Sequence, residues 1–198
     1  MRKSAVLIVV LWATGGAYAA SGFPSVSPGT EYRQLGAAVY SPNDAGWSLM
    51  QSTPQGFAFG RQFGDKDDSA IINTTVFAVE GIDKDSEFLD YIASQREAQD
   101  DKKRFKVVSV KNEQTSFKGT ACLKYQTVSE DHKGRGITSK KFEYLKAYGY
   151  ICRHPDNRTV AFQMEVSHRS KEATFPDALL STGDSFFQTI QFNADGLK

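Results

Sequence analysis

The stretch TACLKYQTVSEDHKGRGITSKKFEYLKAYGYIC, residues 120–152, contains both cysteines of the chain. The segments at its two ends are rich in apolar and aromatic residues, as β-strands are, and the charged, turn-forming run 131–141 separates them. If the two strands fold back on each other symmetrically, Ile137 lies at the midpoint and Cys122 faces Cys152. The sequence therefore predicts an antiparallel hairpin with one cysteine on each strand.

The same register places compatible side chains opposite each other on the other face of the hairpin. Leu123 pairs with Ile151, and the ring of Tyr125 covers Gly149, as cross-strand packing favours. Directly opposed Cα atoms of an antiparallel pair lie about 4.5–5.5 Å apart, within the range that a disulfide tolerates. We therefore predict a disulfide between the two cysteines, which stabilises the fold by about 2–4 kcal/mol.

Metal binding and redox chemistry are weaker interpretations of the two cysteines. Cys152 and His154 lie two residues apart on the same side of a strand, and with Cys122 opposite they would begin a metal site. A closed zinc site needs four ligands, usually in close-spaced pairs, and the sequence contains no C-x-x-C and no H-x-x-x-H motif. A thioredoxin-like site also needs C-x-x-C at a helix start. We predict no metal and no cofactor.

The first residues have the three-part layout of a secretory signal peptide. A basic start at residues 1–3 precedes the apolar run Ala5–Ala13, and Ala17-Tyr18-Ala19 forms a small-x-small cleavage site. We expect a signal peptide over residues 1–19, and then a flexible leader over residues 20–38, which begins rich in Ser, Pro and Gly. The protein is then expected to be exported, to the bacterial periplasm or as a secreted protein.

The remaining residues, 39–198, are predicted to form a single α+β domain. Arg2 and Lys3 leave with the signal peptide, so the 24 basic residues fall to 22, against 23 acidic ones. A near-neutral chain has no general attraction to nucleic acid, so we expect no nucleic-acid partner. No stretch after the signal peptide is apolar enough for a transmembrane segment.

Outside the cysteine hairpin, the domain contains further strand-like segments and two helical ones. Strands are expected over residues 46–52, 56–63, 69–79, 104–117 and 158–167, and helices over residues 83–102 and 175–190. The last helix carries an apolar stripe with Gly183 in it, where we expect close packing. The predicted fold is an antiparallel sheet of about six to seven strands packed by two helices.

This order of segments resembles the PsbP/Mog1-like α/β/α sandwich. The resemblance rests on GW at Gly46, FLDYIASQ at Phe88, VVSV at Val107 followed by GTACLKYQ at Gly119, and FFQTIQF at Phe186. It extends over residues 39–192 and is one of element order rather than of a diagnostic motif. It implies an accessory or adaptor domain without enzymatic activity that binds partner proteins or sometimes ions, and no functional residue is carried over from the family.

Two surfaces are candidates for binding. The hairpin loop carries four basic residues, Lys133, Arg135, Lys140 and Lys141, which would dock on an acidic partner or lipid headgroups, or would simply keep the tip solvated. Tyr144, Tyr148 and Tyr150 share one face of the second hairpin strand. That face is a binding surface if only one side of the sheet is covered, and core if both sides are.

Catalytic motifs are absent from the sequence. The three histidines, His132, His154 and His168, have no G-x-S-x-G motif to accompany them, and no glycine-rich phosphate loop is present. Paired carboxylates from distant strands remain open as an enzymatic site. We therefore expect an exported non-enzymatic binding or accessory protein, whose partner is an unknown protein or small ligand and whose oligomeric state is open. The alternative is a small secreted hydrolase or metal-dependent enzyme with a site built from scattered residues.

Overall fold

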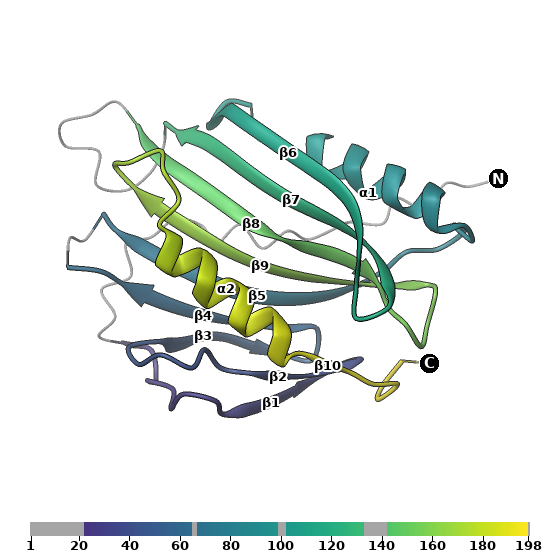
Figure 1. Cartoon of the computed structure of the whole chain (residues 1–198). Helices are drawn as coiled ribbons and strands as arrows, with labels where there is room; N and C mark the ends of the chain where they lie inside the picture. Colours follow the sequence, from purple (N-terminus) through teal and green to yellow (C-terminus); the bar gives the residue numbers. More distant parts are fainter. Residues whose placement is uncertain (1–21, 65–66, 99–101, 133–141, 198) are drawn as a thin grey trace.

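The protein is built around a long antiparallel sheet (Figure 1). The computed structural model describes residues 22–64, 67–98, 102–132 and 142–197. The sheet contains β3 (Ser48–Thr53), β4 (Gly56–Gln62), β5 (Ser69–Ala78), β6 (Phe105–Phe117), β7 (Thr120–Asp131), β8 (Glu143–Arg153) and β9 (Val160–Ser170), in the order β3-β4-β5-β9-β8-β7-β6. Every neighbouring pair is antiparallel. The prediction of an α+β fold with an antiparallel sheet and two helices is therefore confirmed.

The inner strands show the period of two that their sequences predict. On β5, Ala70 and Ile72 point into the core while Ser69 and Ile71 are only half-buried. The strand pairs with β9 along its whole length, where Ile72 lies opposite Val166. β-branched side chains on both strands pack well on a pleated surface, which explains why this pair lies inside the sheet.

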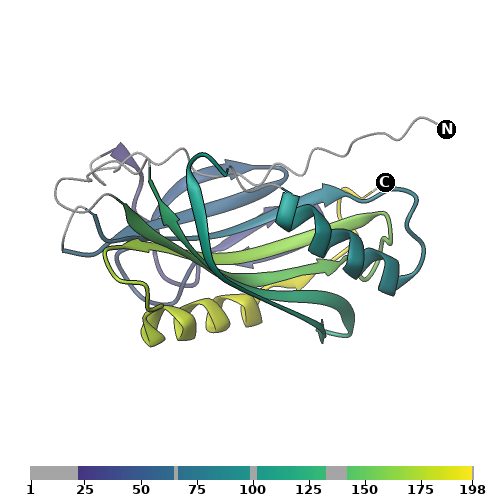
Figure 2. The ribbon, with the colours of Figure 1, turned by 90° about the horizontal axis from the view of Figure 1, so that it is seen from above.

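Two helices cover opposite faces of the sheet (Figure 2). α2 (Asp177–Thr189) places Phe186 and Phe187 in one core, and α1 (Asp85–Ala98) places Phe88 and Ile92 in a second core on the other face. Gly183 of α2 lies where a Cβ atom would come within 2.7 Å of a Val166 methyl group, so the helix packs closely against β9 as the sequence predicted. None of the helices in the described part of the chain is long and apolar enough to cross a membrane.

A second, smaller sheet lies beside the first and was not predicted. It consists of β1 (Glu31–Gln34), β2 (Ala37–Tyr40) and β10 (Gln191–Phe192), in the order β1-β2-β10. The expectation of a flexible leader over residues 20–38 is therefore wrong for its second half, because β1 and the first residues of β2 pair there and bury Ala37 and Ala38. The expected signal peptide, residues 1–19, lies outside the described residues.

Candidate functional site

The cysteine hairpin has the register that the sequence predicts. Cys122 lies opposite Cys152 with their Cα atoms 4.0 Å apart, and a disulfide joins them. Leu123 faces Ile151 in the same register. Both sulfur atoms are completely buried in the core beneath α2. The disulfide prediction is confirmed, and the thiols are not available as metal ligands.

His154, which the sequence placed beside the cysteines, is also buried. Its Nε2 atom lies 2.7 Å from the carbonyl oxygen of Gly36, in the turn between β1 and β2. Gly36 has a φ of +75°, and a Cβ atom there would come within 2.8 Å of the same nitrogen. The imidazole therefore fixes the small sheet against the hairpin, which is a structural role.

The tyrosines on β8 are largely covered. Tyr148 is only 7% exposed, because α2 lies over it, and its hydroxyl donates a 2.6 Å hydrogen bond to Asp184. Burial, helped by that hydrogen bond, raises the pKa of the Tyr148 phenol. Tyr150 is half-buried with its ring 5.7 Å from that of Phe187, and Tyr144 is half-buried as well. Of the two interpretations, the structure therefore supports the core for Tyr148, and the three do not form an open surface.

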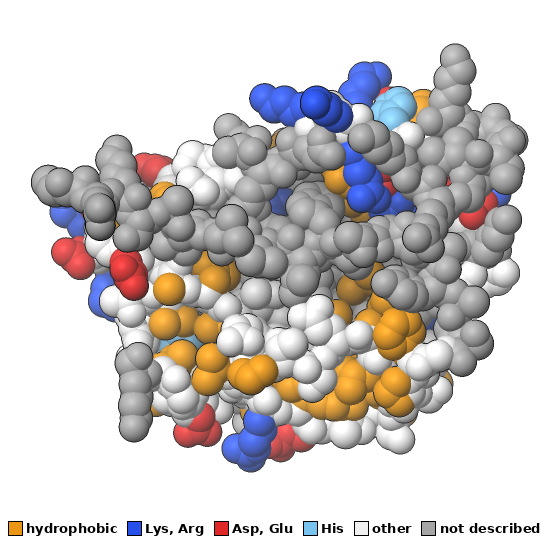
Figure 3. Space-filling view, turned by 180° about the vertical axis from the view of Figure 1, so that it is seen from behind, with side chains coloured by type: hydrophobic (Ala, Val, Ile, Leu, Met, Phe, Trp, Pro, Cys, Tyr) orange, Lys and Arg blue, Asp and Glu red, His pale blue; other side chains and the backbone are white. Residues whose placement is uncertain are grey.

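The four basic residues of the hairpin loop, Lys133, Arg135, Lys140 and Lys141, lie outside the described residues. The base of the loop is described and combines both signs of charge. Figure 3 shows basic side chains gathered beside a histidine at one end of the molecule. At the base of the loop, Glu130 lies 3.3 Å from Lys106 and 3.1 Å from His132. Acidic side chains therefore neutralise basic ones at the root of the loop.

Beside this base, a buried ion-pair network joins three strands. Arg104 donates two hydrogen bonds of 2.9 and 2.8 Å to Asp131, which is completely buried, and Arg169 donates a third. Glu143 is buried nearby with its carboxylate 3.7 Å from Arg169, and burial raises its pKa. Arg104 and Arg169 compensate Asp131 inside the fold and anchor the strand ends, whereas both carboxylate oxygens of Glu143 are buried without a hydrogen-bond partner.

The other face of the same sheet end holds a buried lysine and a buried histidine. Lys146 donates hydrogen bonds to the Ser170 hydroxyl, at 2.6 Å, and to the Glu172 carbonyl, at 2.5 Å. Burial lowers its pKa to about 8. His168, directly opposite Lys146 on β9, places Nε2 2.6 Å from Asp68, and burial lowers its pKa too. Both side chains fasten neighbouring loops to the sheet.

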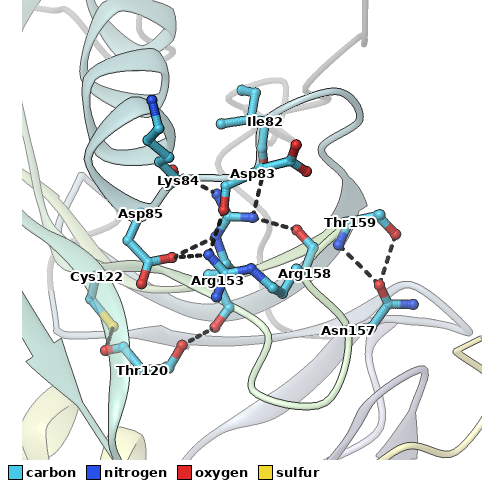
Figure 4. Close-up of polar contacts among 10 residues, drawn as sticks. All are labelled: Ile82, Asp83, Lys84, Asp85, Thr120, Cys122, Arg153, Asn157, Arg158 and Thr159. Carbon is cyan, nitrogen blue, oxygen red and sulfur yellow. Dashed lines mark hydrogen bonds and ion pairs between the residues drawn. The ribbon is translucent and has the colours of Figure 1, made fainter.

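Arg153 plays the same part at the opposite end of β8 (Figure 4). Its guanidinium donates to the carbonyl oxygens of Ile82, Lys84 and Arg158 at 2.9, 3.2 and 2.7 Å. Its Nε lies 3.1 Å from Asp85, the first residue of α1. The start of α1 is therefore held on the sheet by one almost fully buried side chain. Sequence reasoning missed this residue, because nothing in its neighbourhood distinguishes it from a surface arginine.

The buried His, Lys and Asp side chains described above thus make contacts that stabilise the fold. Among the described residues, no three His, Cys, Asp or Glu side chains are grouped so that they would hold a metal ion. His132 is the histidine with substantial exposure, and its Nε2 atom lies 3.1 Å from the carboxylate of the half-buried Glu130. The exposed large hydrophobic residues of the described chain lie elsewhere, on the edge strand β6.

β6 is a long strand at the edge of the main sheet. It runs for 13 residues, and nine successive ones from Lys106 to Gln114 are exposed. Val107, Val108 and Val110 are exposed to 41–53%, and they are the exposed large hydrophobic residues of the described chain. Exposed edge strands are normally short or otherwise protected, because their free backbone groups attract other strands. The sequence predicted this strand but gave no sign that it lies at the edge.

The backbone groups that β6 directs away from the sheet follow from the hairpin geometry. The Cα atoms of Cys122 and Cys152 are close together, as they are in antiparallel pairs whose backbone groups do not hydrogen-bond to each other. The backbone amide and carbonyl groups of Cys122 therefore point away from β8 and toward β6. There it faces Thr115, whose backbone groups therefore point inward. Alternation along the strand leaves the amide and carbonyl groups of Val110, Asn112 and Gln114 pointing outward.

No protein-family model matches the chain, and no curated protein matches its sequence. Several solved structures are similar to it, and two of them illustrate the degree of likeness. One is PA94, a protein of unknown function from Pseudomonas aeruginosa, with 17% identity over 81% of this chain and 92% of that chain, at a TM-score of 0.43. The other is the cyanobacterial PsbP (CyanoP) of Synechocystis, with 11% identity over 85% and 94%, at 0.41. The latter bears the name of the family that the element order resembles, and no functional residue is taken from either protein.

Proposed function

We propose that the protein is an exported, non-enzymatic binding protein that holds an extended segment of a partner polypeptide along β6. The open edge of the main sheet carries this proposal. Strand addition supplies affinity through main-chain hydrogen bonds and selectivity through alternate side chains. β6 provides both, with outward amide and carbonyl groups from Val110 to Gln114 and exposed side chains on each face.

The two edges of the sheet differ in a way that favours β6. At the other edge, the residues before β1 run along β3: Leu49 donates a 2.9 Å hydrogen bond to the Pro24 carbonyl, and Val26 donates one of 3.0 Å to the Trp47 carbonyl. The chain thus covers β3 with its own backbone. Within the described ranges, β6 is the last strand on its side and no other strand is paired with it there.

Export is supported by the layout of residues 1–19 and by the buried disulfide, because disulfides persist in compartments outside the cytoplasm. A role in binding rather than catalysis is supported by the use of buried polar groups. Three buried side chains donate hydrogen bonds to backbone carbonyl groups of neighbouring segments and so stabilise the fold: Lys146, Arg153 and His154.

Site-specific photo-crosslinking tests the binding surface. A photoreactive amino acid at Asn112, in the protein expressed with its leader, is expected to form a covalent adduct with a polypeptide in the exported fraction. The same amino acid at Ser181, an exposed position on α2, serves as the matched control. An Asn112→Pro change combined with a photoreactive residue at Val110 removes one outward amide and is expected to abolish the adduct.

The proposal fails if no adduct forms at Asn112, or if the adducts at Asn112 and Ser181 are the same. Export is read from the same preparation, because cleavage after Ala19 gives a mature chain that begins at Ala20 in an intact-mass measurement. A full-length chain recovered only from the cytoplasm would remove that part of the proposal.

A further inference from the structure

We propose that the segment bound along β6 is β6 of a second copy of this chain, paired antiparallel about a twofold axis at Asn112. The inference rests on the proposed function, since it names the occupant of the same edge. It follows from two properties of the strand, namely which backbone groups point outward and how charges are spaced along it, and the regular part of the strand contains the resulting register.

Backbone direction limits the possible registers. Val110, Asn112 and Gln114 point their amide and carbonyl groups outward, and the residues between them point inward. In a symmetric pair, an outward-pointing residue has to lie opposite another outward-pointing one, because only then do donors meet acceptors. The twofold axis therefore lies between the two copies of one residue of β6, so that this residue is opposite itself in the partner.

Charge then selects among the remaining registers. Lys111 and Glu113 are two residues apart on the same face of the strand. With the axis at Asn112, Lys111 lies opposite the partner's Glu113, and Glu113 lies opposite the partner's Lys111. With the axis at Lys111 two lysines are opposed, and with the axis at Glu113 two glutamates are opposed, which is unfavourable. The strand is thus complementary to itself in one register.

The neighbouring strand continues the charge pattern. Inside one chain, Glu113 faces Lys124 of β7. In the dimer, this carboxylate would lie between Lys124 of its own chain and the partner's Lys111, so that both of its lateral neighbours are cationic. Because Lys111 and Glu113 are directly opposed in a pair without backbone hydrogen bonds, their side chains approach more closely than in the alternate pairs.

The regular part of β6 is long enough to contain this register. The register against β7 shifts between Val107 and Ser109, which marks a bulge at one end. On the other side of Asn112, the matching position to Ser109 is Thr115, still inside the regular ladder. The regular ladder continues to Phe117, so it contains the whole segment from Ser109 to Thr115 that is centred on Asn112, and another strand is able to join it there.

The opposite face of the pair buries apolar surface. Val110, which is 45% exposed in the single chain, would lie opposite the partner's Gln114, and Asn112 would meet the same residue of its partner. Gln114 is already oriented by a 3.4 Å hydrogen bond to Asp90 of α1. Two seven-stranded sheets would thus become one continuous sheet, and each copy would protect the edge of the other.

Charge reversal in solution tests the register. Sedimentation of the mature, disulfide-bonded chain over a range of concentrations is expected to show a monomer–dimer equilibrium. Lys111→Glu and Glu113→Lys should each weaken dimerisation by about tenfold or more, because each creates two like-charge pairs. The double variant Lys111→Glu/Glu113→Lys should recover the dimer. Lys106→Glu, which changes the same charge beyond the bulge, is the matched control and should have little effect.

Covalent trapping gives a second readout that does not depend on charge. Asn112→Cys places two thiols across the axis, at about 5.5 Å between Cα atoms, and should form an intermolecular disulfide under mild oxidation. Gln114→Cys, which would face the partner's Val110, should not. Unchanged circular dichroism and melting temperature show that each variant is folded.

A chain that stays monomeric at high concentration overturns the inference, and a double variant no better than the single ones overturns the register. The proposed function fails separately. If the chain is monomeric and a photoreactive residue at Asn112 captures a different protein, strand addition stands and the second copy does not. If no adduct forms at Asn112 and no dimer forms, both are wrong.

Discussion

The disulfide should contribute a large share of the stability, and its removal is the most quantitative test of the hairpin. Cys122 and Cys152 are 30 residues apart in sequence, and the loss of loop-closure entropy in the unfolded chain scales with that length. The chain-entropy relation gives about 3–4 kcal/mol at 25 °C for a loop of this size. A domain of ordinary stability has about 5–15 kcal/mol in total, so the reduced protein should retain about 1–12 kcal/mol and stay folded without denaturant.

Urea denaturation with and without reductant measures this contribution directly. Reduction keeps both sulfur atoms in the core, so the loss of unfolding free energy reports mainly the unfolded chain. Replacing both cysteines by alanine also leaves a small cavity at two completely buried positions, and should cost about 1 kcal/mol more than reduction. The reduced chain should also show a larger m-value, because its unfolded state is more expanded without the cross-link.

A loss of less than about 1.5 kcal/mol on reduction would refute this reasoning. It would mean that the hairpin stays closed in the unfolded ensemble without the bond, so that the disulfide constrains nothing further. An equal effect of reduction on a control protein without cysteines would instead reveal a solvent effect of the reductant.

Three further changes test the packing of the two helices and the buried charges. Gly183→Ala should lower the unfolding free energy by about 1–2 kcal/mol, because the clash with Val166 exceeds the gain in helix propensity, whereas Ser181→Ala on the exposed side of α2 should not lower it. Arg153→Met should lower the unfolding free energy by about 3 kcal/mol and increase amide hydrogen exchange at the start of α1, because the carbonyl groups of Ile82 and Lys84 lose their donor. Unchanged exchange at the start of α1 would show that Arg153 does not hold the helix on the sheet. Burial lowers the pKa of His168, so as the pH drops below about 6.5 the unfolded chain takes up a proton before the folded chain does, and the unfolding free energy should fall. Equilibrium unfolding of His168→Asn should show a weaker dependence of that free energy on pH. The same dependence in the variant and the unchanged protein would show that this histidine is not its cause.

The relation between sequence and structure differs from element to element. The pairing of Cys122 with Cys152 could be derived because consecutive strands of a hairpin have a register fixed by the loop midpoint and by alternation. The packing of Gly183 against the sheet could be derived from its place in an apolar stripe with the helical period. Both follow from local patterns: the first from the midpoint of one hairpin, and the second from the helical period of one segment.

The order of the strands across the sheet could not be derived from such local patterns. β5 pairs with β9 across the whole of the intervening helix and hairpins, and no local pattern in either strand identifies its neighbour. β1 and β2 have only four residues each and β10 has two, which is too short for a periodic signal. Their pairing depends on the two ends of the chain meeting in the folded molecule.

The amino-acid sequence by itself determined the class of the fold, the cysteine pairing and the apolar faces of the helices, because these depend on alternation and spacing. Only the tertiary structure decided which strand is left at the edge, and that Lys146 and Arg153 are buried while Val108 is exposed. The physical reason is that burial belongs to a position in three dimensions, and the same strand sequence is core or surface according to what the rest of the chain places beside it.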